Sequence, residues 1–384
     1  MSLTPTLVAA VPFAIWLYLF FLRGNFWQVH EDTTEPKALQ RWPGVVAIVP
    51  ARDEEQTITR CVISLAKQNY AGDFSIVVVD DHSSDGTAEL ARKAAEESGA
   101  ARKVTVHSAG ELPPGWTGKV WAMNEGVAAA RGKAPEYFWF VDADITQAPE
   151  SLPELVSRAT NGEFDLASWM ALLQAKTFPE RLLIPSFLYF FLMLYPPNWV
   201  ADPKARTAGA AGGCILLRRT ALERIGGMAT IRNEVIDDCA LAGAVKESGG
   251  KVWLGVTRKS RSLRGCATLG ELRDMIARTA FTQLHYSFLL LLGTLAWLVI
   301  TYLLPWVLFF EYPGQAWLLV DTTVALMAAS FLPTVKFYDL SWTWALTVPI
   351  AALFYAYATC VSAVRYWLGR GGQWKGRAQA PQKR

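Results

Sequence analysis

The pattern of apolar and polar residues separates an apolar N-terminal segment from a mixed central region. Residues 3–22 carry no charged side chain and approach the ~20 residues that a membrane-spanning helix needs. The segment lacks a basic leading stretch and a small-residue cleavage site, which favours an uncleaved anchor over a cleaved signal peptide. We therefore interpret residues 1–23 as a transmembrane anchor and the polar residues 24–43 as a linker.

In the central region, short apolar runs alternate with segments of helical periodicity. The apolar runs predict strands at residues 45–49, 75–79, 104–107 and 137–141. The periodic segments predict helices at residues 54–68, 85–98 and 118–131, the first of them capped by Asp53. Strands that alternate with helices form parallel βαβ units, so we expect a Rossmann-like α/β domain. Ligands of such domains bind beyond the carboxyl ends of the strands.

Other apolar stretches are candidate membrane segments. Residues 287–310, 316–335 and 342–367 are long enough to span a membrane, although the middle stretch contains Asp321. Residues 181–197, inside the central region, are apolar but short. They suggest an interfacial segment, and a buried core helix is the alternative. The tail at residues 368–384 carries only basic charges.

Composition narrows the possible function classes. Hydrophobic residues make up 52% of the chain and there are 16 tryptophans, which agrees with membrane segments. The net charge of +3 gives no reason to expect a nucleic-acid partner. The five cysteines have no paired spacing and the four histidines form no ligand cluster. We therefore expect reduced, mostly buried thiols without a catalytic or metal-binding role.

Two aspartates, Asp142 and Asp144, follow the most apolar of the predicted strands. In an extended backbone alternate side chains point the same way, so we expect the two carboxylates to act together beyond the strand end. A carboxylate pair there is costly to bury without a positive charge, and a divalent cation that carries a diphosphate would supply it. An acidic loop without a ligand is the alternative for this motif alone.

Other predicted strands also end in acidic residues, within 50–55 and 80–87. Carboxylates at this edge suit ribose hydroxyls, a base N–H and a metal ion. No Gly-x-Gly-x-x-Gly motif follows the first strand and no Walker lysine motif is present, which argues against a dinucleotide site and a P-loop. Lys119 opens a predicted helix, where its charge adds to a position already favourable for phosphate. An ordinary surface lysine is the alternative.

In this order, the motifs resemble those of family 2 glycosyltransferases with the GT-A fold. The resemblance rests on residues 50–55, 79–87, 118–119 and 142–144, within a region from residue 45 to about 285. Residues 115–119, the apolar ends and the Asp237-Asp238 stretch are most similar to hopene-associated glycosyltransferases of bacterial hopanoid gene clusters, with carotenoid glycosyltransferases close in pattern. The implied fold is a mixed-sheet GT-A domain at 44–285, followed by transmembrane helices at 286–367.

The resemblance implies roles around the nucleoside of a sugar donor. Ala51 and Glu54 would line the nucleoside pocket. Asp80 or Asp81 would hold the base.

The resemblance also implies roles around the phosphates and the sugar. Lys119 would lie near the donor phosphates. Asp142 would touch the ribose or the metal, and Asp144 would bind Mg²⁺ or Mn²⁺. Gly212 and Gly213 resemble the glycine-rich loop near the sugar, and a tight bend before a strand at 215–217 is the alternative.

Asp237 and Asp238 correspond to the acidic motif that carries the catalytic base in the family. Asp238 takes the position of the base, and Asp237 stands where the family usually has glutamate. A solvated helix terminus is the alternative for this pair alone. The Gln-x-x-Arg-Trp motif of processive polysaccharide synthases is missing, and residues 278–283 occupy the corresponding region. This departure implies transfer of one sugar rather than polymerisation.

The implied protein is an inverting glycosyltransferase of the bacterial inner membrane. It would move one sugar from a nucleotide-diphosphate sugar, a UDP-sugar, to a lipid acceptor such as a hopanoid or related isoprenoid. A polyprenyl-phosphate acceptor is the alternative within the class, and Arg261 and Arg264 could bind its phosphate. A non-catalytic, nucleotide-binding membrane scaffold is the alternative from another class. Nucleotide sugars are made in the cytoplasm and imply that the catalytic domain lies there, and the basic tail also favours the cytoplasm. Three full spans between the domain and the tail would place them on opposite sides of the membrane, so the number of spans stays open.

Overall fold

The computed structural model describes residues 4–31, 39–311, 316–371, 373–374 and 377–378. Packing divides the chain into two units, each built from separate segments. The sheet unit comprises residues 31–174, 199–265 and 372–384, and the helical unit comprises residues 1–30, 175–198 and 266–371. Residues 32–38 of the expected linker and most of the expected basic tail lie outside the described residues.

The sheet unit contains an eight-stranded mixed sheet in the order β3-β2-β1-β4-β7-β6-β8-β5. Its strands are β1 (Val45–Ala51), β2 (Phe74–Asp80), β3 (Val104–Ser108), β4 (Tyr137–Phe140), β5 (Ile145–Gln147), β6 (Leu166–Leu172), β7 (Ile215–Arg218) and β8 (Val252–Ser262). β1, β2, β3 and β4 pair in parallel, as the alternating pattern predicted. β7 runs antiparallel to β4 and β6, and β5 runs antiparallel to β8, so the sheet is mixed, as the GT-A resemblance implied. The two-residue strands β9 (Gln373–Trp374) and β10 (Arg377–Ala378) pair separately.

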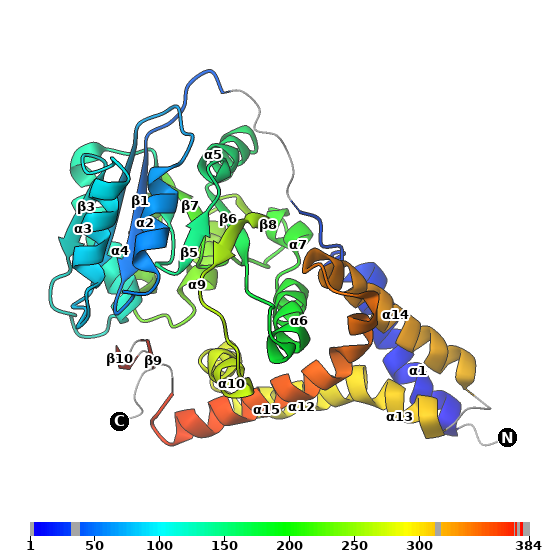
Figure 1. Ribbon diagram of the computed structural model, residues 1–384. Helices are drawn as coiled ribbons and strands as arrows, with labels where there is room; N and C mark the ends of the chain where they lie inside the picture. Colours follow the sequence, from blue (N-terminus) through cyan, green and yellow to red (C-terminus); the bar gives the residue numbers. More distant parts are fainter. Residues whose placement is uncertain (1–3, 32–38, 312–315, 372, 375–376, 379–384) are drawn as a thin grey trace. The chain divides into compact units, whose positions relative to one another are not determined.

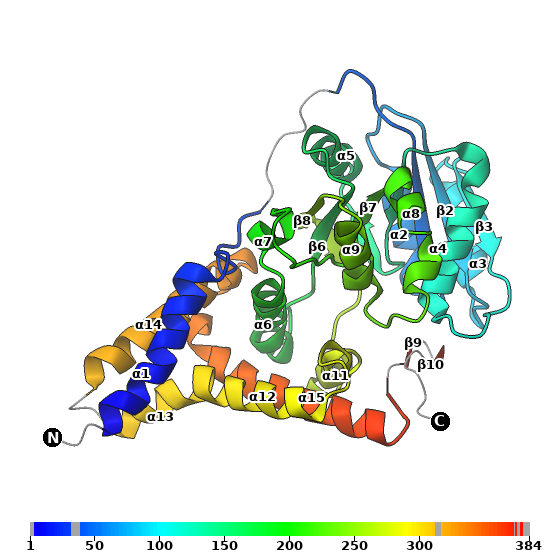
Figure 2. The same cartoon turned by 180° about the vertical axis from the view of Figure 1, so that it is seen from behind.

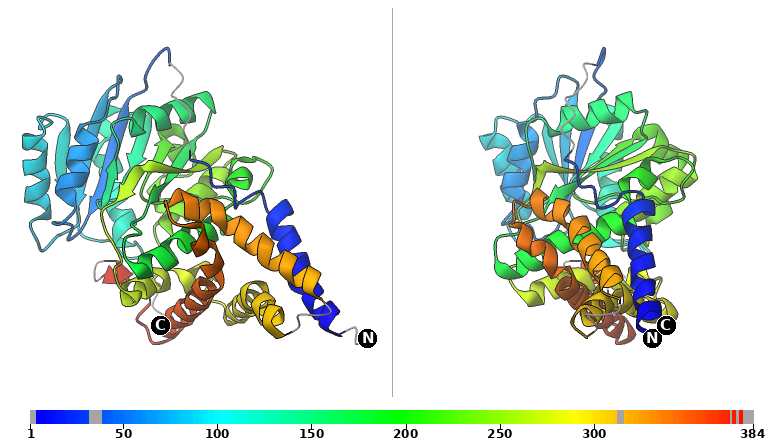
Figure 3. Two further views of the ribbon diagram at one scale, coloured as in Figure 1. Left: turned by 45° about the vertical axis from the view of Figure 1, so that its right-hand side comes forward. Right: turned by 90° about the vertical axis from the view of Figure 1, so that its right-hand side faces the viewer.

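Helices cover both faces of the eight-stranded sheet (Figure 3). They are α2 (Ile58–Ala66), α3 (Thr87–Glu97), α4 (Gly118–Ala129), α5 (Ser151–Asn161), α8 (Arg219–Arg224) and α9 (Asp237–Glu247), with short 3₁₀ turns at Arg131–Lys133 and Met228–Ile231. Figure 1 shows α2, α3 and α5 on one face, and Figure 2, from behind, shows α4, α8 and α9 on the other. The sheet is therefore buried on both sides, which explains why its central strands are continuous apolar runs.

The first helix of the sheet unit begins later than its periodicity suggested. α2 starts at Ile58 and not at residue 54, because Asp53 has a φ of 52° and cannot lead directly into a right-handed helix. The Asp53 carboxylate does not cap α2 but accepts the N–H of Ser84 at 2.7 Å. This contact ties the loop after β1 to the loop after β2, so two of the acidic strand ends are held together.

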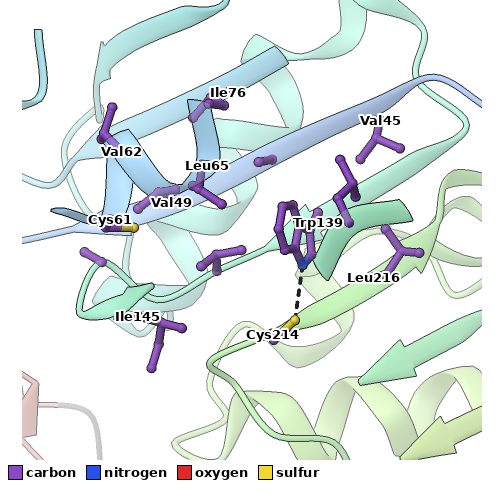
Figure 4. Close-up of a cluster of buried hydrophobic side chains, with 14 of the residues drawn as sticks. Val45, Val49, Cys61, Val62, Leu65, Ile76, Trp139, Ile145, Cys214 and Leu216 are labelled. Atoms are coloured by element: carbon purple, nitrogen blue, oxygen red, sulfur yellow. Dashed lines mark hydrogen bonds between the residues drawn. The ribbon is translucent and has the colours of Figure 1, made fainter. Parts of the chain in front are cut away.

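A hydrophobic core lies between the sheet and the helices α2, α3 and α5. Alternate residues of β1, namely Val45, Ala47 and Val49, are buried on this face. Figure 4 shows Trp139 of β4 donating a hydrogen bond from Nε1 to Cys214 Sγ, at 3.2 Å. Burial raises the pKa of the Cys214 thiol to about 12, so this cysteine is a protonated core residue.

The helical unit is formed by apolar helices from all three of its segments. They are α1 (Thr4–Leu17), α6 (Phe178–Leu194), α10 (Leu269–Ala277), α11 (Ala280–Gln283), α12 (Phe288–Leu298), α13 (Leu304–Glu311), α14 (Trp317–Phe337) and α15 (Val348–Trp367), and α7 (Pro197–Ala201) continues from this unit into the sheet unit. Short π-helical segments follow α1 at Tyr18–Leu22 and α12 at Val299–Leu303, and a 3₁₀ segment precedes α15 at Trp342–Thr347. α1 packs along α14 (Figure 3), and the buried Trp16 donates from Nε1 to the Thr301 carbonyl oxygen at 2.8 Å.

Four helices of the described chain are long and apolar enough to cross a membrane, Phe178–Ala201, Phe288–Glu311, Trp317–Phe337 and Trp342–Trp367. The first has 24 residues and is longer than the interfacial segment expected at 181–197, because it begins at Phe178, after the capping Thr177, and α7 continues it beyond Pro197 to Ala201. The apolar helix Thr6–Leu22 is shorter than these four and falls below the length expected of the N-terminal anchor.

The two units do not follow the domain limits expected from the sequence. Residues 175–198 and 266–285 group with the helical unit and not with a continuous domain at 44–285. Their side chains bind the C-terminal helices directly. The Tyr189 hydroxyl lies 2.8 Å from Ser330 Oγ, and Ser362 Oγ donates to the Ala277 carbonyl oxygen at 2.5 Å.

Candidate active site

Asp142 and Asp144 lie in the turn that connects β4 to β5. The N–H of Ile145 donates to the Asp142 carbonyl oxygen at 3.0 Å, so this segment is a turn and not the extended chain expected from the sequence. The two carboxylates therefore meet different cations. Asp142 Oδ1 lies 2.9 Å from Lys119 Nζ, and Asp144 Oδ2 lies 3.4 Å from Arg264 Nε. The segment is thus not an extended strand, but the two carboxylates are close enough for the charge of Asp142 to raise the pKa of Asp144.

Lys119 connects the carboxylates of two sequence motifs. Its Nζ lies 2.9 Å from Asp142 Oδ1 and 3.2 Å from Asp237 Oδ2. Just before α4, the N–H of Thr117 donates to the Arg232 carbonyl oxygen at 2.7 Å, which anchors the start of the helix to the segment before α9. Burial alone lowers the pKa of Lys119, but the charges of the nearby aspartates outweigh it and raise this pKa. Lys119 is therefore a permanent positive charge, not an ordinary surface lysine.

Asp238 lies in the first turn of α9 with both carboxylate oxygens bound to backbone N–H groups. Oδ2 accepts from Gly212 at 2.8 Å and Oδ1 accepts from Cys239 at 2.7 Å. Burial and the adjacent charge of Asp237 nevertheless raise the pKa of Asp238 to about 6. Consecutive helical residues point about 100° apart, which explains why Asp237 faces Lys119 while Asp238 faces the glycine loop.

Gly212 marks the point where these side chains converge. A methyl group added there would lie 3.1 Å from Lys119 Nζ, 3.4 Å from Asp238 Oδ2 and 3.6 Å from Asp142 Oδ2. The missing side chain keeps this space open between one cation and two carboxylates. Gly213 has another role, because a methyl group on it would meet the first side chain of β5 at 3.2 Å.

Arg264, two residues beyond β8, joins Asp144 to Glu54. The antiparallel pairing of β5 with β8 extends beyond the strands, because the Leu263 N–H donates a hydrogen bond to the Asp144 carbonyl oxygen at 2.7 Å. The side chain of the next residue, Arg264, therefore reaches the loop after β1, where its Nη2 lies 2.6 Å from Glu54 Oε2. From the sequence, Arg264 could be associated only with the phosphate of an alternative acceptor. Its position beside Asp144 could not be predicted, because it depends on the register of β5, a strand of three residues.

The residues expected at the nucleoside differ in burial. Ala51 and Asp81 are fully buried, with 0% exposed, and the Asp81 N–H donates to the Ala51 carbonyl oxygen at 2.8 Å. The Asp81 carboxylate lies 3.7 Å from Arg52 Nη1. Asp80 is half-buried, and its Oδ1 has no hydrogen-bond partner within the described part of the chain. The two residues thus differ in exposure, and Asp80 is the more accessible of them.

Negative charge is concentrated at the end of β4. Burial and the charge of Asp142 raise the pKa of Asp144 to about 6, and Arg264 offsets this only in part. Hard divalent cations prefer such carboxylate oxygens. No group of three or more His, Cys, Asp and Glu side chains that could hold a metal occurs among the described residues. Asp142 and Asp144 alone would therefore supply only part of the oxygen ligands that such a cation takes.

Residues 46–226 match the family model described as Glycosyl transferase family 2. An N-acetylglucosaminyltransferase from Rhizobium leguminosarum bv. viciae is 29% identical over 191 residues, 47% of this chain and 40% of the relative. A dodecaprenyl-phosphate galacturonate synthase from Rhizobium johnstonii is 31% identical over 121 residues, 31% of this chain and 33% of the relative. The chain thus spans less than half of the length of either relative.

A solved structure is also similar, the mannosyltransferase PcManGT from Pyrobaculum calidifontis in complex with GDP-Man and Mn²⁺. The TM-score is 0.55 at 18% sequence identity, and the match covers 94% of this chain and 99% of that chain. At this identity the likeness concerns the fold alone. The region matched by the family model contains β1 to β4 and the motif residues from Ala51 to Gly213. Residues 46–226 are therefore similar in sequence to the glycosyltransferases of family 2.

Proposed function

We propose that this protein is a membrane-bound, inverting glycosyltransferase that moves a single sugar from a nucleotide-diphosphate sugar to a lipid acceptor. The observation that carries the proposal is the convergence of Lys119, Asp142 and Asp238 around the open backbone position of Gly212. These residues come from separate sequence motifs and place one cation and two carboxylates around a single space. A sugar donor needs such an arrangement at its diphosphate and at its anomeric carbon.

The leaving diphosphate gains negative charge during the reaction, so the site must stabilise it. Lys119 stays protonated and is held in place by Asp142 and Asp237, so it can attract the departing phosphate oxygens without reorganising. A divalent cation held by Asp142 and Asp144 would add Lewis-acid stabilisation of the same diphosphate.

Asp238 is the proposed base. Its carboxylate accepts the proton of the acceptor hydroxyl while the hydroxyl oxygen bonds to the anomeric carbon and the bond to the diphosphate breaks. A single displacement of this kind inverts the configuration at that carbon. The raised pKa of about 6 suits the role, because the group is ionised at neutral pH and still binds a proton readily.

A neutral lipid hydroxyl, on a hopanoid or a related isoprenoid, is the proposed acceptor. The long apolar helices support a lipid substrate. Of the two arginines that could bind a phosphorylated acceptor, Arg261 has another partner, because its Nε donates to the Arg258 carbonyl oxygen at 2.8 Å. A polyprenyl-phosphate acceptor is the second candidate, and the similarity to the dodecaprenyl-phosphate galacturonate synthase supports it.

We propose a UDP-sugar as the donor and the cytoplasmic side of the bacterial inner membrane as the location of the sheet unit, because nucleotide sugars are made in the cytoplasm. A non-catalytic scaffold is the less favourable alternative. Burial raises the pKa of both Asp144 and Asp238, so their charges are costly to keep in a protein that does not use them.

The test is release of the nucleoside diphosphate from a panel of UDP- and GDP-sugars by the full-length protein in vesicles of bacterial lipid extract. We expect donor-specific release and a glycosylated lipid in Mn²⁺, and loss of both in EDTA or in Asp144→Ala. A glycosylated neutral lipid supports the first acceptor, and a sugar on a polyprenyl phosphate supports the second. Full activity of Asp144→Ala in EDTA would contradict the metal role, and no release from any donor would contradict the enzymatic proposal.

A further inference from the structure

The Arg264 guanidinium lies between two carboxylates that the donor site is expected to use. It is 2.6 Å from Glu54 Oε2 through Nη2 and 3.4 Å from Asp144 Oδ2 through Nε. Glu54 belongs to the loop after β1, and Asp144 is the proposed metal ligand after β4. One positive group of the chain thus contacts both strand ends before any ligand binds and offsets their negative charge in part.

A guanidinium and a divalent cation cannot share this position without strong repulsion. The carboxylate of Asp144 would have to coordinate the ion while a fixed positive charge remained within hydrogen-bonding range of the same group. Lys119 contacts the other proposed metal ligand, because its Nζ pairs with Asp142 and Asp237 and not with Asp144. Arg264 is therefore the basic residue that competes with the cation for Asp144.

We propose that Arg264 is a positioning residue that occupies Asp144 in the absence of donor and so makes divalent-metal binding depend on the nucleotide. This inference rests on the proposed function. It assigns to Arg264 a role in the order of ligand binding, in addition to the residues that touch the reacting atoms.

The donor can reverse this competition because its diphosphate offers the guanidinium other oxygens. Arginine binds phosphate through two parallel N–H groups, which is among the strongest pairings available to it. The Arg264 side chain is 46% exposed, so it can turn toward a ligand without unpacking the core. Once it turns, Asp144 is released to the cation that accompanies the same diphosphate.

Arg261 provides a matched control three residues earlier. It is also an exposed arginine near the end of β8, but its Nε binds the Arg258 carbonyl oxygen at 2.8 Å and no site carboxylate. Removal of its charge changes the net charge of the protein by the same amount as removal of Arg264. A difference between the two variants therefore reports the position of the charge and not its presence.

The experiment titrates MnCl₂ into the full-length protein and follows free Mn²⁺ by electron paramagnetic resonance, with and without UDP or GDP. We expect wild type to bind Mn²⁺ weakly alone and at least about 5-fold more tightly with one of the two nucleotides, the lower end of usual coupling between sites. Arg264→Gln should bind Mn²⁺ alone at least about 5-fold more tightly than wild type and should lose most of the nucleotide effect. Arg261→Gln and the charge-conserving Arg264→Lys should resemble wild type.

Several results would overturn the inference. Unchanged or weaker Mn²⁺ binding by Arg264→Gln would show that the guanidinium does not compete, and the same gain in Arg264→Lys would show that its charge is not the cause. In both cases wild type still binds Mn²⁺ with nucleotide, so the proposed function stands. If wild type binds no Mn²⁺ even with UDP or GDP, the metal role in the proposed function fails, and the competition fails with it. Wild-type binding of Mn²⁺ that is equally tight with and without nucleotide would also overturn the inference, even where a variant folds poorly.

Discussion

At the scale of single residues, two adjacent aspartates perform different tasks. Asp238 holds both of its oxygens against backbone N–H groups, whereas Asp237 forms an ion pair with Lys119. The backbone bonds fix the Asp238 carboxylate without supplying a counter-charge of their own, so it remains able to accept a proton. Asp237 instead holds the cation in place, which makes its contribution indirect.

The first prediction concerns this division of roles. Asp238→Asn keeps the size of the side chain but removes its basicity, so turnover should fall by roughly 10²-fold or more, the scale expected for loss of a general base. Asp237→Asn should reduce turnover less. The measurements are turnover and donor affinity for both variants, and NMR of the anomeric linkage in the product. An inactive Asp237→Asn beside an active Asp238→Asn would reverse the assignment, and a retained linkage would exclude the single displacement.

The second prediction follows from the raised pKa of Asp238, about 6. Only the ionised carboxylate can take a proton, so turnover at saturating donor and Mn²⁺ should fall as the pH drops through about 6 and should be level above it. Saturating Mn²⁺ is needed because a bound cation keeps Asp144 ionised in the same range. The check is the pH dependence of turnover, and a profile that is flat from pH 5 to 8, on the order of three units around this pKa, would count against Asp238 as the base.

At the scale of elements, three of the four strands predicted within residues 45–141 are mostly buried, and β3, at the edge of the sheet, is partly exposed. β1, β2 and β4 read as continuous apolar runs because helices cover them on either side. β5 is only three residues long, and β8 alternates buried with partly exposed residues and carries several basic side chains, so neither shows a clear local pattern. Because the pairing of β5 with β8 joins residues far apart in the sequence, no local pattern predicts it.

The same distinction applies to the candidate site. The residues carried by sequence motifs at strand ends and helix starts, such as Asp142, Lys119 and Asp238, could be named from the sequence, and the structure brings them together. The turn at Asp142 and the position of Arg264 could not be predicted from the sequence. Both depend on how β5 leaves the end of β4 and pairs with β8, and that is a property of the assembled sheet.

The third prediction tests the glycine loop between β6 and β7. Gly212→Ala should fold, because this glycine does not have a positive φ, but its methyl group would lie 3.1 Å from Lys119 Nζ. We expect turnover to fall at least about 10-fold, since small displacements of catalytic groups are costly. Gly243→Ala in α9 is the control, because nothing lies within 4 Å of its added methyl group. That variant should keep its activity and gain up to about 1 kcal/mol of stability from helix propensity. Equal activity of the two variants would contradict the assigned role of Gly212.

The fourth prediction concerns the contact of α4 with the sheet, which positions Lys119. A methyl group on Gly126 would lie 2.4 Å from Ile48 Cγ2 and 3.1 Å from Val79 Cγ2, so the helix could not stay so close to β1 and β2. Gly126→Ala should lower the free energy of unfolding by about 1–3 kcal/mol, the usual cost of overpacking a core. Thermal unfolding in detergent measures it. A melting temperature at or above that of wild type would show that the helix moves without cost.

At the scale of the whole molecule, the helical unit presents apolar side chains that a water-exposed surface would not tolerate. Leu289 is 77% exposed, Phe310 is 72% exposed and Leu318 is 63% exposed, and all three belong to helices long enough to cross a membrane. Large contiguous apolar surfaces mark contact with lipid or with another protein. For this unit, the length and composition of the helices favour lipid.

The fifth prediction is therefore that the protein stays in the membrane after washing with high salt or alkaline carbonate, because burial of apolar surface does not weaken with ionic strength. Protease added to intact bacterial spheroplasts should leave residues 45–174 uncut and should cut them once the cells are opened. Release of the protein by either wash would contradict a spanning arrangement. Cleavage of these residues from the outer side would place the sheet unit on the opposite face from the one we propose.

The strand order has a consequence for biosynthesis. β8 lies between β6 and β5 in the sheet, yet in the chain it follows the long apolar helix Phe178–Ala201. That helix is therefore synthesised while β5 still lacks the strand with which it pairs. One edge of β6 stays unpaired until residues 252–262 emerge, and unpaired edges invite aggregation. Closure of the sheet is consequently expected to follow synthesis of that helix, and no single uninterrupted stretch of the chain can be expressed to give the complete sheet without it.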